Sequence, residues 1–319
     1  MSDGPGQASK VAVIGLGSIG IAWAIVFARA GWTVTGYDVD PGMRKTAGER
    51  FAERLQRLTE AGLPVGKATT LDVANSLESA LAESMWVQEC VVESLPIKKQ
   101  LFAQLDTHTC PDTVLASSTS MIPCSQWAAD LVGRSRCLVV HPGNPPYLLP
   151  IAEVVPAPFT ADHVVKSAMS ILAQVDMTPV LVRGEPEGFV FNRLQGALLR
   201  EAYCLVRDGV IEPRDLDRVV TGGLGRRWAI AGPFATSHLN TRGGLRRHAA
   251  LMGPAYERMG LQRGQHDPWT DDLVNLVATA VESAIPLTSW EEHVLRRDAA
   301  LAENERTRNN AAELFASFQ

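Results

Sequence analysis

Cysteine is scarce in this sequence and is not arranged for disulfides or for a metal site. The chain has 319 residues and no C-x-x-C pair, and its five cysteines are Cys90, Cys110, Cys124, Cys137 and Cys204. An odd number without paired spacing argues against a disulfide framework and favours a reducing, cytoplasmic setting. We expect buried cysteines that pack as small hydrophobic side chains rather than a nucleophile at Cys124 or Cys204. No bound metal is expected.

Long hydrophobic runs and a strong positive charge are also missing. No apolar run approaches the roughly 20 residues that span a bilayer. Residues 1–9 are polar, lack the hydrophobic centre of a signal peptide, and are expected to form a disordered leader. The formal net charge of −5 gives no positive field for nucleic acid or anionic lipid. We therefore expect a cytoplasmic globular protein that acts on a small molecule, without a nucleic-acid or membrane partner.

Short apolar runs alternate with helical patterns through the first half of the chain. The runs read as strands are VAVIG, TVTGYD, WVQECVVES, TVLASST, CLVVHP and IAEVVP. This alternation is typical of a mostly parallel sheet with helices on both faces. After about residue 183, a segment rich in glycine and proline precedes helical patterns, and the first of these covers Asn192 to Asp208. The sequence thus predicts a sheet domain over 10–189 and an all-helical domain over 190–319.

Three glycines follow the first strand with the spacing G-x-G-x-x-G. Gly15 permits a tight turn, Gly17 lets the backbone approach a pyrophosphate, and Gly20 lets the next helix pack against the strand. Asp38 ends the second strand, where a carboxylate would bind ribose hydroxyls and repel a 2′-phosphate. The pattern predicts an NAD site, with a flavin site or an empty Rossmann-like fold as alternatives. The expected cofactor contacts at the turn are Gly15, Gly17, Ser18, Ile19 and Gly20.

Further motifs occur in a fixed order along the chain. They are VVESLPIKKQLFAQLD, SSTS, HPGNPPYLLPIAEVVP and GFVFNRL. With them, the chain resembles the L-3-hydroxyacyl-CoA dehydrogenase family over nearly its whole length. The stretch GLGRRWAIAGPFATSHLN is similar to the lambda-crystallin, or L-gulonate 3-dehydrogenase, branch of that family. The resemblance implies a Rossmann-type doubly wound, mostly parallel sheet, followed by an all-helical C-terminal domain that forms a homodimer, with NAD as the cofactor.

The resemblance also implies the catalytic residues. His141 ends a strand, and Glu153 follows 12 residues later, which is the spacing of the family's His–Glu pair. A histidine can take a hydroxyl proton while hydride leaves carbon, and a carboxylate on its other nitrogen fixes the tautomer. Ser120 and Asn192 match family residues that bind the substrate oxygen. Considered alone, these residues could also be a core histidine, a salt-bridge partner, a turn serine and a helix N-cap.

Three more charged residues match family positions. Glu93 and Lys98 correspond to residues near the nicotinamide ribose, although as bare sequence they look like an exposed pair. Arg227 matches an arginine of the lambda-crystallin stretch, in which Trp228 here replaces tyrosine. Its guanidinium could bind a carboxylate through two parallel hydrogen bonds, or it could form a salt bridge within the protein.

The implied activity is NAD-dependent oxidation of the 3-hydroxyl of a small hydroxy acid. The alternatives are oxidation of an L-3-hydroxyacyl-CoA, an activity like that of carnitine dehydrogenase, and a structural role like that of a crystallin. A CoA thioester needs a basic groove for its phosphates. The segment 41–62 carries such residues, interrupted by acidic ones: Arg44, Lys45, Arg50, Arg54 and Arg57.

Overall fold

The computed structural model describes residues 9–66, 70–229, 232–242 and 244–263, with scattered residues between 272 and 307. The chain divides into two units, one formed by residues 1–193 with 295–319 and the other by residues 194–294. The expected leader lies, except for Ser9, outside the described residues. The predicted helical domain runs to residue 319, whereas the structure groups residues 295–319 with the sheet. Within that range, Ala302 is buried in the core of the sheet unit.

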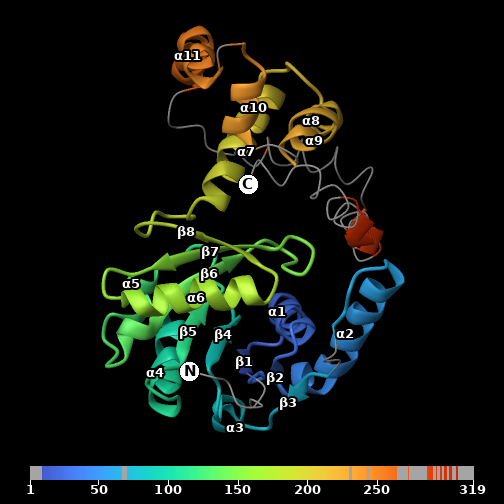
Figure 1. Cartoon of the computed structure of the whole chain (residues 1–319). Coiled ribbons are helices and arrows are strands. Elements are labelled where there is room, and N and C mark those ends of the chain that lie inside the picture. The colour runs from blue at the N-terminus through green and yellow to red at the C-terminus, as the bar shows by residue number, and fades with distance from the viewer. Residues whose placement is uncertain are drawn as a thin grey trace. The chain divides into compact units, whose positions relative to one another are not determined.

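An eight-stranded sheet organises the first unit (Figure 1), in the order β3-β2-β1-β4-β5-β6-β7-β8. Every neighbouring pair is parallel except β6 with β7. The predicted doubly wound, mostly parallel sheet is therefore confirmed. The sequence analysis did not predict β3, which has only two residues, or β8, whose residues are mostly exposed. The strands are β1 (Lys10–Ile14), β2 (Thr33–Tyr37), β3 (Asp72–Val73), β4 (Trp86–Glu89), β5 (Val114–Ser117), β6 (Cys137–Pro142), β7 (Ile151–Pro156) and β8 (Thr178–Leu181).

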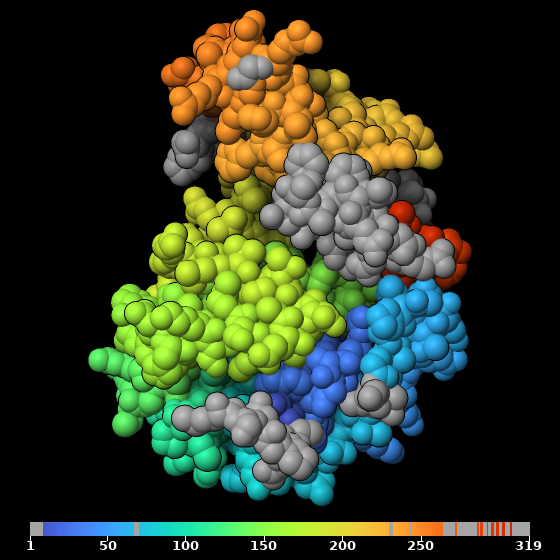
Figure 2. All heavy atoms as spheres, in the orientation of Figure 1, coloured from blue at the N-terminus to red at the C-terminus, as the bar shows by residue number. Residues whose placement is uncertain are grey.

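Helices cover both faces of this sheet and give it two hydrophobic cores. One core contains side chains of α1 (Ser18–Arg29), α2 (Pro41–Glu60) and α6 (Asp162–Gln174). The other contains side chains of three further helices, which are α3 (Leu77–Leu81), α4 (Leu95–His108) and α5 (Cys124–Ala128). Figure 2 shows α1, in dark blue, between α6 in lime green and α2 in light blue. This position explains why residues 20–28 of α1 are all buried and apolar or glycine.

The second unit is helical throughout the part that the structure describes, as predicted. Its first helix begins in the sheet unit, one residue before the predicted start at Asn192. The described helices are α7 (Phe191–Arg207), α8 (Pro213–Val219), a π-helical turn (Val220–Leu224), α9 (Gly225–Trp228), α10 (Pro233–Leu239), α11 (Gly244–Arg263) and a 3-10 helix (Leu287–Ser289). Among the described residues of the whole chain, no helix is both long enough and apolar enough to cross a membrane.

Candidate active site

A histidine and a glutamate face each other across the one antiparallel pair of the sheet. In the register of β6 and β7, His141 lies directly opposite Glu153. His141 Nδ1 is 2.7 Å from Glu153 Oε2, and the two residues are only 6% and 4% exposed. Residues opposite each other in an antiparallel pair place their side chains on the same face at close range. His141 and Glu153 are separated by 12 residues in the sequence and are in direct contact because the chain returns between the two strands in this register.

The other oxygen of Glu153 is held by the backbone at the start of α7. Its Oε1 accepts hydrogen bonds from the N–H groups of Val190, at 2.8 Å, and Phe191, at 2.9 Å. Burial alone would raise the pKa of Glu153, but the hydrogen bonds from His141 and these two amides outweigh it and lower the pKa below 4.5. The carboxylate thus stays ionised and can only accept, so Nδ1 of His141 carries the proton and Nε2 is left as a base.

An aromatic residue in an unusual backbone conformation directly precedes the two N–H groups that bind Glu153. Phe189 has φ of 51°, in the left-handed region, directly after Gly188 with φ of 74°. A bulky residue in that conformation costs on the order of 1–3 kcal/mol, and the surrounding structure must hold it there. The Phe189 side chain is fully buried, with its ring centroid 5.7 Å from that of His141. Sequence analysis missed this residue, although it lies in the GFVFNRL motif.

Ser120 and Asn192, expected at the substrate oxygen, are brought together by the fold. Asn192 Nδ2 donates a hydrogen bond to the backbone carbonyl of Ser120 at 3.1 Å. The Ser120 hydroxyl makes no hydrogen bond to any residue that the structure describes. It lies on an exposed residue and is therefore available to a ligand.

Lys98 is buried rather than exposed, so its interpretation as half of a surface pair is wrong. Its side chain is 1% exposed, and Nζ lies 2.9 Å from both carboxylate oxygens of Glu89. Glu89 is fully buried and also accepts a hydrogen bond of 2.5 Å from the Ser117 hydroxyl. In the sequence, only the position of Glu89 at the end of a strand could have marked this residue. The burial of Lys98 depends on this partner, because a buried ammonium group requires pairing.

Glu93 links this buried pair to the loop that carries Ser120. Its Oε2 lies 3.5 Å from Lys98 Nζ. Its Oε1 accepts hydrogen bonds from the Thr119 hydroxyl at 2.5 Å and from the N–H groups of Ser120 and Met121 at 3.1 Å each. The structure therefore gives Glu93 a defined task, which is to hold the Ser120 loop.

The glycine-rich turn has the shape that a dinucleotide requires. Gly15 has φ of 96°, and a Cβ there would lie 2.6 Å from the carbonyl oxygen of Cys90. A Cβ on Gly20 would collide with the carbonyl oxygen of Gly15. Gly17, in contrast, faces open space at the start of α1, with no atom within 4 Å of an added Cβ. The first and third glycines thus allow close packing, and the second leaves backbone accessible to a pyrophosphate. At the start of α1, Ser18 is exposed and Ile19 is half-buried.

A cavity of about 540 Å³ adjoins this turn and is lined in part by Gly15, Gly17, Tyr37 and Asp38. Asp38 Oδ2 accepts a hydrogen bond from Leu16 N at 2.7 Å, and its Oδ1 accepts one from Asp40 N at 2.9 Å. Each carboxylate oxygen can accept a second hydrogen bond, so Asp38 retains capacity for ribose hydroxyls. These residues fit NAD.

We expect NAD to be preferred over NADP because the Asp38 carboxylate repels a 2′-phosphate. The kcat/KM with NAD should exceed that with NADP about a hundredfold or more, and this ratio should fall to about tenfold in Asp38→Ser. The positive charge of Arg44 should contribute to this fall, because its Nη1 lies beside Asp38 and donates to the Asp38 carbonyl at 2.6 Å. The matched control is Asp40→Ser at the exposed N-cap of α2, which should leave the preference unchanged. Equal use of both cofactors by the parent would show that Asp38 does not bind the ribose.

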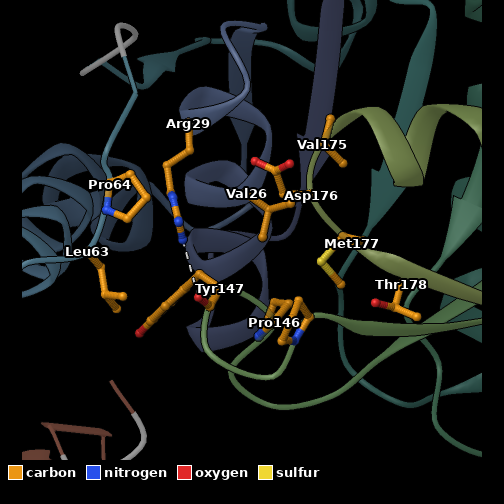
Figure 3. Close-up of a pocket in the computed structure, with 11 residues that line it drawn as sticks. Val26, Arg29, Leu63, Pro64, Pro146, Tyr147, Val175, Asp176, Met177 and Thr178 are labelled. Atoms are coloured by element: carbon orange, nitrogen blue, oxygen red, sulfur yellow. Dashed lines mark hydrogen bonds between the residues drawn. The ribbon is translucent and has the colours of Figure 1, made fainter. Parts of the chain in front are cut away.

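A second cavity, of about 250 Å³, lies elsewhere in the sheet unit (Figure 3). Arg29, Tyr147 and Asp176 are among the residues that line it, and Arg29 Nη1 donates to the Tyr147 carbonyl at 3.3 Å. Its lining includes neither a residue of the dyad nor a glycine of the turn. It is therefore separate from the cofactor cavity.

The cysteines are all free, and three of them are poor nucleophiles. Burial raises the pKa of Cys90 and of Cys137 to about 12, and it raises that of Cys124 well above its usual value. Their thiols therefore remain protonated near neutral pH. Within the described part of the chain, no group of three or more His, Cys, Asp or Glu side chains is placed to hold a metal ion.

Arg227 belongs to the second unit, on α9. It is exposed, and its guanidinium carbon lies 5.9 Å from the centroid of the Trp228 ring. It forms no ion pair with any residue that the structure describes. The salt-bridge alternative thus has no partner in this part of the chain.

The doubly wound sheet and the glycine-rich turn define the protein as a dinucleotide-binding protein of the Rossmann type. Residues 10–185 match the NAD-binding domain of 3-hydroxyacyl-CoA dehydrogenase, and residues 188–280 match the C-terminal domain of the same family. The chain belongs to the 3-hydroxyacyl-CoA dehydrogenase family and is an NAD-dependent dehydrogenase. The predictions of family, enzyme class and cofactor are confirmed.

Several relatives are similar over nearly the whole chain. The human lambda-crystallin homolog is 34% identical over 310 residues, covering 92% of this chain and 96% of the relative. The L-carnitine dehydrogenase of Streptomyces coelicolor is 34% identical over 309 residues, with 94% of each chain covered. A solved structure of 5-formyl-3-hydroxy-2-methylpyridine 4-carboxylic acid 5-dehydrogenase, an NAD+ dependent dismutase, is 27% identical. It has a TM-score of 0.80 and covers 94% of this chain and 99% of that one.

Proposed function

We propose that this protein uses NAD to oxidise the 3-hydroxyl group of a small hydroxy acid, with L-gulonate as the model substrate. The buried pair of His141 and Glu153 is the observation that carries the proposal. Packing alone would not require a carboxylate that is kept ionised by two backbone amides and directed at an imidazole nitrogen. The arrangement suits general base catalysis, because the carboxylate fixes the tautomer of the imidazole and stabilises the positive charge that it then carries.

In the proposed reaction, His141 Nε2 takes the proton of the substrate hydroxyl, and the electron pair of the O–H bond becomes the second C–O bond of the new carbonyl. Bound NAD supplies the acceptor for the hydride that leaves the same carbon. Glu153 stabilises the imidazolium that results, and the proton then passes to solvent. The Ser120 hydroxyl and the Asn192 amide bind the reacting oxygen and keep it near Nε2.

The described residues favour a free acid over a CoA thioester. Three arginines of α2 are engaged close to their own helix. Arg44 donates to the carbonyls of Asp38 and Val39, Arg50 donates to the Met43 carbonyl at 3.1 Å, and Arg57 pairs with Glu53 at 2.7 Å. These contacts hold the three side chains at the helix, and Glu53 neutralises Arg57, which supports a free acid rather than a CoA thioester as the substrate. The solved relative is also named as a dehydrogenase of a carboxylic acid, which supports the same proposal.

We propose that Arg227 binds the substrate carboxylate. It would come from the same chain or from a second copy in a homodimer. Arg227→Met should raise the KM for the hydroxy acid about tenfold to hundredfold and leave the affinity for NAD unchanged. Arg227→Lys should restore only part of the loss, because a point charge cannot reproduce two parallel hydrogen bonds. Arg226→Met is the matched control on the same short helix.

The deciding experiment measures NADH formation by the parent across L-gulonate, other 3-hydroxy acids, carnitine and 3-hydroxybutyryl-CoA, with methyl esters of the acids as controls. We expect the free acids to be preferred over their esters and over the thioester. Carnitine as the best substrate would instead favour the activity for which the Streptomyces coelicolor relative is named. Preference for the thioester, with Arg227→Met unimpaired, would establish the 3-hydroxyacyl-CoA alternative instead. Absence of NADH formation with every compound would leave the crystallin-like structural role.

A further inference from the structure

An arginine of α2 reaches across to the first turn of α1. Arg54 Nη1 donates to the carbonyl of Ser18 at 2.8 Å, and Nη2 donates to the Ser18 hydroxyl at 3.0 Å. Ser18 is the first residue of α1 and directly follows Gly17, the glycine whose surroundings are open. The guanidinium therefore lies at the residue that directly follows the open glycine of the turn.

This is an unfavourable place for a positive charge when no anion is present. The N-terminus of a helix carries a partial positive charge, and cations there are destabilising. No acidic residue occupies the first turn of α1, and Arg54 forms no ion pair with any described residue. A second cation, Arg50, is close by. Burial lowers the pKa of Arg50 most, the positive charge of Arg54 lowers it further, and the charge of Asp38 offsets part of the effect.

We infer that Arg54 is a cofactor-binding residue whose guanidinium contacts the pyrophosphate of the dinucleotide. A guanidinium has five N–H donors, and Arg54 donates only two hydrogen bonds to the residues that the structure describes. The two bonds to Ser18 fix the planar group at the start of α1, so the remaining donors are held in place for an anion. Arg54 thus adds a side-chain contact to the backbone N–H groups of the turn, and the anion neutralises both positive groups. The inference rests on the dinucleotide assignment of the glycine-rich turn.

The test compares ligands with and without the pyrophosphate. Arg54→Gln should weaken the binding of NAD and of ADP-ribose about tenfold, because a charge-assisted hydrogen bond to phosphate is lost. Binding of adenosine, measured by NMR titration, should not change. Arg54→Lys should keep part of the affinity for ADP-ribose, and the loss in Arg54→Gln should shrink at high salt. The melting temperature of the unliganded Arg54→Gln protein should equal or exceed that of the parent, because the helix start loses a neighbouring cation.

The matched control is Arg57→Gln, one turn further along the same face of α2, where the arginine pairs with Glu53. This variant should bind ADP-ribose as the parent does. Unchanged ADP-ribose binding in Arg54→Gln would overturn the inference, and so would an equal loss for adenosine together with a lower melting temperature. Weakened binding of CoA alone would also overturn it, because the anion would then belong to CoA. A parent that binds neither NAD nor ADP-ribose would refute the dinucleotide assignment itself.

Discussion

Replacing His141 with glutamine should lower kcat by about a hundredfold to ten-thousandfold while the affinity for NAD stays nearly unchanged. The variant keeps a polar side chain opposite Glu153 but loses the base. The dyad lies on β6 and β7, apart from the glycine-rich turn that follows β1, so cofactor binding should be spared. Stopped-flow turnover and NAD titration of the same preparation separate the two effects.

The pH dependence of the parent provides an independent check on this role. The pKa of Glu153 is lowered, so its carboxylate stays ionised as the pH falls until the pH reaches that lowered pKa. Glu153 should therefore not cause a loss of oxidation rate on the acid side, and any such loss should be absent from His141→Gln, which lacks the base. His163→Gln, on the exposed side of α6, is the matched control and should behave as the parent. Turnover of His141→Gln within a few-fold of the parent would refute the catalytic role.

Adding a single methyl group at Gly20 should disable the cofactor site. The Cβ of Gly20→Ala would collide with the carbonyl oxygen of Gly15, and a backbone atom cannot rotate out of the way as a side chain does. The start of α1 must then move away from the turn. We expect a fall of about 1–3 kcal/mol in the free energy of unfolding. NAD affinity should fall about a hundredfold or more, or roughly 2.7 kcal/mol.

Gly48→Ala is the matched control for this substitution, because Gly48 lies inside α2 with no atom within 4 Å of an added Cβ. There the same methyl group should stabilise the protein by about 0.5–1 kcal/mol, since alanine loses less backbone entropy in a helix. Chemical denaturation and NAD titration of both variants give the comparison. Parental stability and NAD affinity in Gly20→Ala would mean that α1 does not pack on the turn as closely as the structure shows.

The sequence by itself determined the features that depend on local backbone chemistry. Most strands and helices follow from the alternation of apolar runs and helical patterns, because burial imposes those periods on each segment. The glycine-rich turn was also predictable, since the positive φ of Gly15 and the contact at Gly20 exclude a side chain. The resemblance to one family then identified NAD as the cofactor and supplied His141 and Glu153 as a pair.

Only the tertiary structure decided which side chains meet across elements. The register of β6 and β7 places His141 against Glu153, and a shift of one residue would turn one of them to the opposite face. Lys98 looked exposed because a charged residue is normally solvated, and its burial depends on Glu89, nine residues away on another element. The contact between Arg54 and Ser18 spans 36 residues and exists because α2 packs beside α1. Separation along the chain fixes none of these contacts, because each is set by how strands pair and helices pack.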